Sequence, residues 1–151
     1  MKYIFFLTIP LFIVDQLTKL AILKTFPDAP PPHQHIEVIP NFFNLTRVHN
    51  TGMAFGLLNG NPFANYIFGA IGLIALTVIV VLWRKNSFPE PLTKTAIALL
   101  IAGIFGNLTV RIIPGRGYVV DFLDFQLPLW HLIDKNSGGH FPSFNVADSC
   151  I

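Results

Sequence analysis

The chain has 151 residues, of which 52% are hydrophobic and only 12% are charged, whereas an ordinary globular domain has about 25% charged residues. Ten basic and eight acidic side chains are too few to cover the surface of a soluble domain of this length. The formal net charge of +2 is no basic excess of the kind that binds nucleic acid, and a single cysteine excludes an internal disulfide. The composition therefore predicts a membrane-embedded protein.

The first apolar segment, at about 3–23, is long enough to cross the roughly 30 Å hydrocarbon layer as a helix. Asp15, Gln16 and Lys19 interrupt it, which argues against a cleaved signal peptide. We therefore expect a retained transmembrane helix. Asp15 and Lys19 are spaced i,i+4 and share one helix face, where we expect a structural ion pair.

Two more apolar segments predict transmembrane helices at about 63–83 and about 92–110. The first has no charged residue and is followed directly by two basic residues. The second contains Gly103 and Gly106, small residues that allow close helix approach.

The two longer connecting segments, about 24–62 and about 111–143, are more polar. A proline-rich stretch at 27–32 ends the first helix. Residues 36–48 mix β-branched, aromatic and polar residues as a half-buried strand pair does, and residues 118–125 are typical of another short strand. We expect these strands to form a small sheet beside the membrane.

The last residues, 144–151, predict the start of a fourth helix that Ser143 or Asn145 could cap. About two turns are too short to span a bilayer. The predicted fold class is therefore an all-α integral membrane protein, forming a single domain over 1–151. It has three full transmembrane helices, a truncated fourth helix and a small outward-facing β-sheet.

Basic residues indicate how the chain is oriented in the membrane. Lys2 and three basic residues of the short 84–94 segment lie at one end of the predicted helices. Short loops rich in Lys and Arg face the cytoplasm. We therefore expect both longer polar segments to face outward.

Two acidic residues, Asp121 and Asp148, lie among apolar residues where the chain approaches the predicted helices. Two carboxylates in one dry site share a proton, so that one can accept a proton from water while the other donates one to an amide. The alternative is that Asp121 pairs with Arg111 or Arg116, and that a helix dipole stabilises Asp148.

Other chemistries fit less well. Ser149 has no evident histidine partner for a nucleophilic mechanism. His33 and His35 have a spacing with little metal specificity, and no phosphate-binding glycine loop is present in the sequence. We expect neither a metal nor a cofactor.

Five sequence blocks are recognisable together over nearly the whole chain. In order, they are VDQLTK (14–19), VIPNFFNLTRVHNTGMAFGLL (38–58), GNLTVR (106–111), GYVVDF (117–122) and FNVADS (144–149). In combination they resemble the bacterial lipoprotein signal peptidases, also called type II signal peptidases.

The resemblance implies an aspartic protease of the bacterial inner membrane with four transmembrane helices and an active site near the periplasmic face. Its substrate would be a lipidated prolipoprotein, cut before a cysteine that carries a diacylglyceryl group, and its other partners would be membrane lipids. We expect a monomer. The resemblance assigns catalysis to Asp121 and Asp148, and the lining of the substrate site to Asn50, Asn107, Arg111 and Asn145.

The chain departs from the family pattern in two places. Val110 stands where the family usually has Asp, so we expect Arg111 to lack a partner. Family members also continue through a complete fourth helix, so we expect a fragment, a truncated product or a degenerate copy. In that case Asp148 would be held loosely and activity would be weak or absent.

Two other functions stay open at this point. The first is a catalytically inactive relative that still binds lipidated peptides. The second is a proton or ion pathway that uses Asp15, Lys19 and Asp121.

Overall fold

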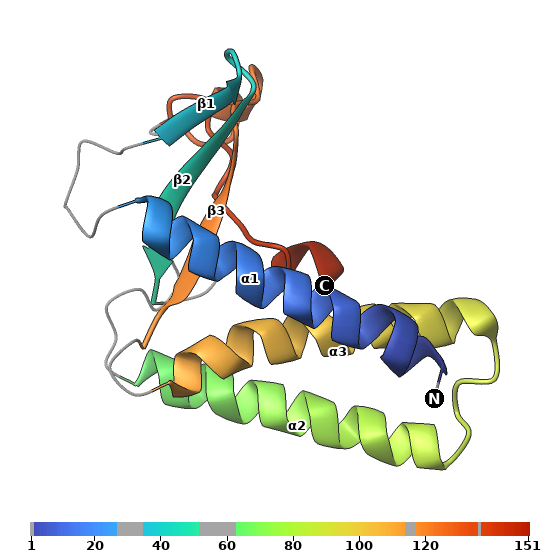
Figure 1. The fold of residues 1–151 in the computed structure, drawn as a ribbon. Helices are drawn as coiled ribbons and strands as arrows, with labels where there is room; N and C mark the ends of the chain where they lie inside the picture. The colour runs from blue at the N-terminus through green and yellow to red at the C-terminus, as the bar shows by residue number, and fades with distance from the viewer. Residues whose placement is uncertain (1, 27–34, 52–62, 114–116, 136) are drawn as a thin grey trace.

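The computed structural model describes residues 2–26, 35–51, 63–113, 117–135 and 137–151. Three long helices lie side by side, and a small sheet stands at one end of them (Figure 1). The helices are α1 (Ile9–Thr25), α2 (Ala64–Arg84) and α3 (Pro91–Ile112). With the turn that precedes α1, each is long and apolar enough to cross a membrane. The three predicted spans are confirmed, but the fold mixes helix and sheet, so the class all-α is too narrow.

A proline shapes the beginning of the first span. Pro10 has no N–H with which to bond the carbonyl of residue 6, so a regular helix loses one bond there. The chain instead forms a π-helical turn at Ile4–Thr8, in which the Ile9 N–H bonds to the Ile4 carbonyl. This wider turn leads directly into α1 and keeps the span continuous over Ile4–Thr25.

The sheet has three antiparallel strands in the order β1-β2-β3. These are β1 (His35–Ile39), β2 (Phe43–Asn50) and β3 (Val119–Phe125), which confirms the strands predicted at 36–48 and 118–125. A tight turn joins the first two strands, with the Phe42 N–H bonded to the Ile39 carbonyl at 3.1 Å. Pro40 followed by Asn41 at φ 56° is the residue pattern of a type II turn.

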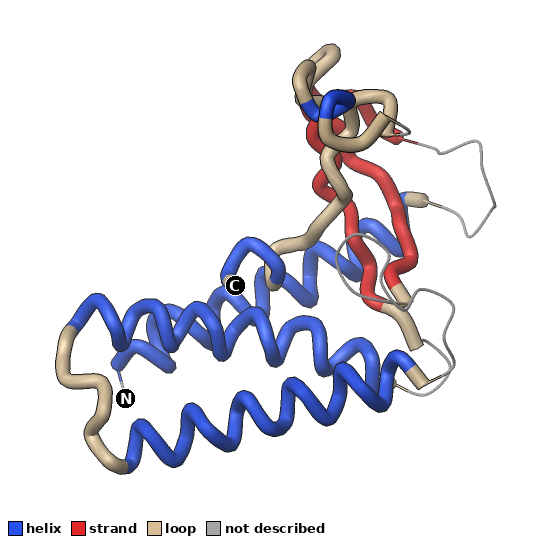
Figure 2. Tube along the Cα trace, turned by 180° about the vertical axis from the view of Figure 1, so that it is seen from behind, coloured by secondary structure: helices blue, strands red, loops and turns tan. Residues whose placement is uncertain are grey.

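A small hydrophobic core attaches this sheet to α1. Ile22 and Phe26, at the end of α1, pack against Val120 and Phe122 of β3. Figure 2 shows the sheet rising from this end of the helices. Because Val120 and Phe122 flank Asp121, this contact holds that acid against the helices.

The predicted fourth helix is not confirmed. Phe144 pairs with Leu123, and its carbonyl accepts the N–H groups of two β3 residues, so the chain here extends the sheet. Only a 3₁₀ turn, Asp148–Cys150, follows. Asn145 caps it reciprocally: its Oδ1 accepts the Asp148 N–H, and Asp148 Oδ2 accepts the Asn145 N–H, each at 3.0 Å.

Candidate active site

Strand β3 places Asp121 in a buried position, where the residue is 2% exposed. The side-chain Nδ2 of Asn50, at the end of β2, donates to Asp121 Oδ2 at 2.9 Å. Asn145 Nδ2 donates to Asp121 Oδ1 at 2.7 Å. Both carboxylate oxygens therefore have amide donors that fix the orientation of the side chain.

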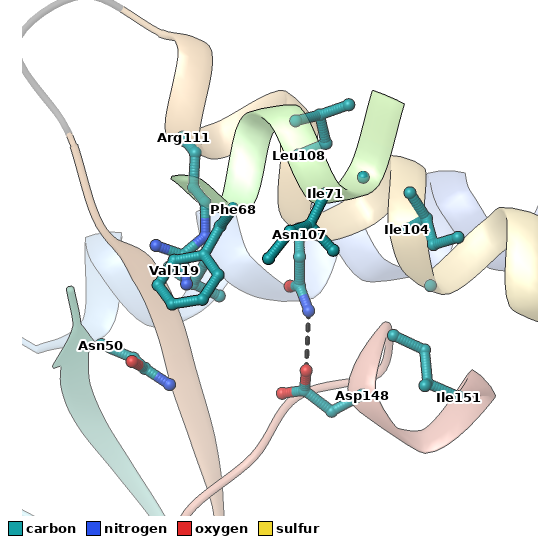
Figure 3. A pocket seen from close by; sticks show the side chains of 12 residues that line it. Asn50, Phe68, Ile71, Ile104, Asn107, Leu108, Arg111, Val119, Asp148 and Ile151 are labelled. Atoms are coloured by element: carbon teal, nitrogen blue, oxygen red, sulfur yellow. Dashed lines mark hydrogen bonds between the residues drawn. The ribbon is translucent and has the colours of Figure 1, made fainter. Parts of the chain in front are cut away.

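The second acid, Asp148, is fixed from two directions. Asn107 of α3 donates from Nδ2 to Asp148 Oδ1 at 2.6 Å (Figure 3). The backbone N–H of Asn145 donates to Asp148 Oδ2 at 3.0 Å. The expectation that Asp148 is held loosely is therefore wrong, because bonds to α3 and to its own turn fix its carboxylate.

Asn145 joins the two acids and is itself fully buried. Its side chain donates to Asp121, and its backbone N–H donates to Asp148. The two carboxylates therefore lie at one site. Burial and the negative charge of Asp148 raise the pKa of Asp121 to about 7, although the Asn50 and Asn145 amides lower it. Near neutral pH the pair can hold one proton, which allows one acid to donate while the other accepts.

Arg111 lies in the last turn of α3 and has neighbours from α2. Its Nη1 donates to Asn65 Oδ1 at 2.9 Å, and its guanidinium lies 4.8 Å from the centre of the Phe68 ring. The expectation that Arg111 lacks a partner is therefore wrong. The residues around Val110 did not indicate Asn65 as the partner of Arg111. The one signal in the sequence was Asn65 itself, an amide at the start of an otherwise apolar helix. Arg116 lies outside the described residues.

The predicted ion pair of α1 is confirmed and reaches the site. Lys19 Nζ lies 2.9 Å from Asp15 Oδ2, and both side chains are almost fully buried. Lys19 Nζ also donates to Asn107 Oδ1 at 2.8 Å, and Asp15 Oδ1 accepts the Ala147 N–H at 2.9 Å. Because Asn107 Oδ1 faces Lys19, its Nδ2 faces Asp148. The i,i+4 spacing predicted the pair, but it could not predict these contacts.

A cavity of about 330 Å³ opens beside Asp148 between α2, α3 and the C-terminal turn (Figure 3). Most of its lining is apolar, and its polar side chains are those of Asn50, Asn107, Arg111 and Asp148. Its lining residues are Asn50, Phe68, Ile71, Gly72, Gly103, Ile104, Asn107, Leu108, Arg111, Val119, Asp148 and Ile151. The cavity therefore offers apolar walls and amide donors next to one carboxylate.

The part of the chain that the structure describes contains no group of three or more His, Cys, Asp or Glu side chains placed to hold a metal ion. His33, one of the two histidines considered for metal binding, lies outside that part.

Three membrane-length helices, with two acids that both bond to Asn145, describe a protein of the membrane-embedded class with a paired carboxylate site. The family model described as Signal peptidase (SPase) II matches residues 7–151. The chain therefore belongs to the signal peptidase II family, whose members are membrane proteases that process lipoproteins.

Named relatives and solved structures agree with this assignment. A lipoprotein signal peptidase of Burkholderia cenocepacia (strain HI2424) is 40% identical over 138 residues, which cover 91% of this chain and 73% of the relative. One from Burkholderia vietnamiensis is 41% identical with the same coverage. A structure titled as a bacterial membrane enzyme solved by the in meso method has a TM-score of 0.75 at 34% identity, covering 95% of this chain and 76% of that one.

Proposed function

We propose that the chain removes signal peptides from prolipoproteins by cutting before a diacylglyceryl-modified cysteine, with Asp121 and Asp148 as the catalytic pair. The observation that carries this proposal is the double role of Asn145, which holds both carboxylates at one site. The neighbouring apolar cavity suits the lipid and signal-peptide parts of such a substrate.

The two acids divide the work of hydrolysis. Asp148, in its ionised form, takes a proton from the attacking water, whose oxygen bonds to the scissile carbonyl carbon. Asp121, whose pKa of about 7 keeps a substantial share of it protonated at neutral pH, donates to the carbonyl oxygen. When the C–N bond breaks, Asp148 donates its proton to the amine of the new terminal cysteine. A hydroxyl of the tetrahedral intermediate returns its proton to Asp121 as the new carboxyl group forms, so the pair again holds one proton.

The remaining polar residues hold the acids and meet the substrate. Asn50, Asn107 and Asn145 orient the carboxylates through the hydrogen bonds described above. Asn50, Asn107 and Arg111 also line the cavity, where amide and guanidinium groups suit the backbone of an unwound peptide. We place the enzyme, as a monomer, in the bacterial inner membrane, with 24–62 and 111–143 on the periplasmic side.

A cleavage assay tests this function. Purified protein in detergent is incubated with a lipidated prolipoprotein, and the product is followed by its shift in gel mobility and by its new amino-terminal cysteine. The unlipidated precursor serves as the matched control and should remain uncut. Cleavage should survive EDTA. Binding of the lipidated precursor without any cleavage would instead identify an inactive relative.

The pH dependence follows from the raised pKa of Asp121. Below about pH 7 the pair holds its shared proton, and above that value the pair loses it. We expect kcat/KM to fall about tenfold for each pH unit above this point, since this constant reports ionisation of the free enzyme. A profile that stays flat to well above pH 7 would contradict a proton on Asp121.

Gly106 of α3 gives a structural test. A Cβ atom there would lie 2.7 Å from Ala147 Cβ and 2.7 Å from Asp15 Oδ2. Gly106→Ala should therefore push the C-terminal turn away from α3 and displace Asp148. A shift of about 1 Å costs on the order of a hundredfold in rate, which the cleavage assay would detect.

Gly69→Ala on α2 is the matched control, because the nearest atom to its added Cβ is Leu108 Cδ1 at 4.0 Å. This variant should retain normal turnover. Equal rates for the two alanine variants would show that the close contact at Gly106 does not position the acid.

A further inference from the structure

A second cavity lies at the end of the helices away from the sheet. Its volume is about 600 Å³, and it lies between the turn before α1, the end of α2 and the start of α3. Figure 1 shows the N-terminus and the α2–α3 connection together at this end. The residues used below are Lys2, Tyr3, Trp83, Asn86, Phe88 and Lys94. None of them belongs to the site of the two acids.

Two of the residues that line the cavity, Lys2 and Lys94, are cationic, and none of its described lining residues is acidic. Lys94 Nζ donates to the Pro89 carbonyl at 2.8 Å, which holds its ammonium in place and leaves it two further protons to donate. Lys2 Nζ lies 5.4 Å from the Tyr3 ring centre. Within the described residues, no salt bridge joins either lysine to an acid. Both ammonium groups can therefore bind an anion.

The surroundings add to this positive charge. α2 ends at Arg84, and Lys85 follows it. Across 84–94, Glu90 is the single acidic residue against three basic ones. The start of α3 at Pro91 adds the partial positive charge of a long helix, and Arg84 in the last turn of α2 offsets the partial negative charge where that helix ends.

The aromatic residues indicate the depth of the cavity in a membrane. Trp83 and Phe88 pack with ring centres 6.2 Å apart, and Tyr3, near the N-terminus, also lines the cavity. Trp and Tyr concentrate where helices leave the hydrocarbon layer for the headgroup layer. Because all three membrane-length helices begin or end here, the lysines lie at the level of lipid phosphates.

We propose that this cavity binds the headgroup of an anionic phospholipid. The phosphodiester accepts hydrogen bonds from Lys2 and Lys94, Asn86 offers an amide to headgroup hydroxyls, and the acyl chains run along the exposed apolar face of α2. Basic pockets between transmembrane helices recognise lipid headgroups in this way. Free phosphate shares the headgroup chemistry but lacks the acyl chains, so the lipid should bind far more tightly.

Native mass spectrometry of the purified protein in a neutral detergent tests the proposal. The probes are phosphatidylglycerol and phosphatidylcholine with identical acyl chains. We expect phosphatidylglycerol to bind in preference. Lys2→Gln and Lys94→Gln should each weaken its binding about fivefold, which corresponds to about 1 kcal/mol per basic residue.

Lys24→Gln is the matched control, because Lys24 is an exposed lysine in the last turn of α1, at the other end of the bundle. It should leave lipid binding unchanged. Equal binding of the two lipids, equal affinity of Lys2→Gln and the unaltered protein, or full competition by inorganic phosphate would each overturn the proposal. Lys2 is exposed, so its substitution preserves the fold even if Lys94→Gln does not. Cleavage in phosphatidylcholine vesicles should be the same for all three variants, which separates this site from the proposed catalysis.

Discussion

Asp121→Asn and Asp148→Asn should each reduce prolipoprotein cleavage about ten-thousandfold, because either change removes one of two proton-transfer groups from a site that needs both. Asparagine keeps the shape of the side chain. Expression and membrane insertion should therefore remain normal. Single-turnover rates measured with each variant in detergent give the comparison.

Asp124→Asn is the matched control for these substitutions. Asp124 is another buried acid of β3, but its carboxylate bonds to His140 at 2.9 Å and to Asn44 at 3.1 Å. Cleavage by this variant should stay within a fewfold of normal. Near-normal turnover by Asp121→Asn together with loss in Asp124→Asn would move the first catalytic acid to Asp124.

Lys19→Met should cost about 3–5 kcal/mol of stability, because it leaves Asp15 as an uncompensated buried charge. It should also lower cleavage, since Asn107 loses the hydrogen bond that directs its Nδ2 toward Asp148. Thermal unfolding and cleavage rate, measured on the same preparation, report the two effects separately.

A second substitution separates the effect of the buried Asp15 charge from the role of Lys19 in positioning Asp148. Adding Asp15→Asn to Lys19→Met removes the buried charge, while the new amide oxygen can still accept the Ala147 N–H. The double variant should regain most of the lost stability but little of the lost activity. Lys24→Met, at an exposed lysine of the same helix, should change neither property. If the double variant regained full activity, Lys19 would have no part in positioning Asp148.

The transmembrane helices were predictable because the bilayer imposes one simple requirement on them. The spans expected at 3–23, 63–83 and 92–110 agree with the observed helices to within a few residues. Hydropathy and length suffice for such segments. The π-helical turn at Ile4–Thr8 was not predicted, although Pro10 was its visible cause.

The C-terminal segment shows where local pattern fails. Residues 144–151 have a good capping residue and apolar positions, which favoured a helix. Phe144 instead bonds to β3, a strand about twenty residues earlier in the chain, and leaves a single 3₁₀ turn after it. These bonds of Phe144 depend on a strand elsewhere in the chain, and no residue of the segment itself carries that information.

The sequence motifs named the residues that meet at the candidate site, but they did not predict the hydrogen bonds between these residues. The motifs implied by resemblance named both acids and the three asparagines. That Asn145 holds both acids at once depends on how β3, α3 and the final turn meet. The link from Lys19 through Asn107 likewise joins residues 88 positions apart. Such contacts are visible only once the chain is folded.

A double-substitution comparison tests most directly whether Asp121 and Asp148 work as one unit. Cleavage rates of Asp121→Asn, Asp148→Asn and the variant with both changes are measured side by side under single-turnover conditions. The effects of substituting groups that act as a unit are strongly non-additive. The cleavage rate of the double variant should therefore lie within a fewfold of the rate of the slower single variant. Losses that multiply in the double variant would show that the two acids act independently and would contradict a shared-proton pair.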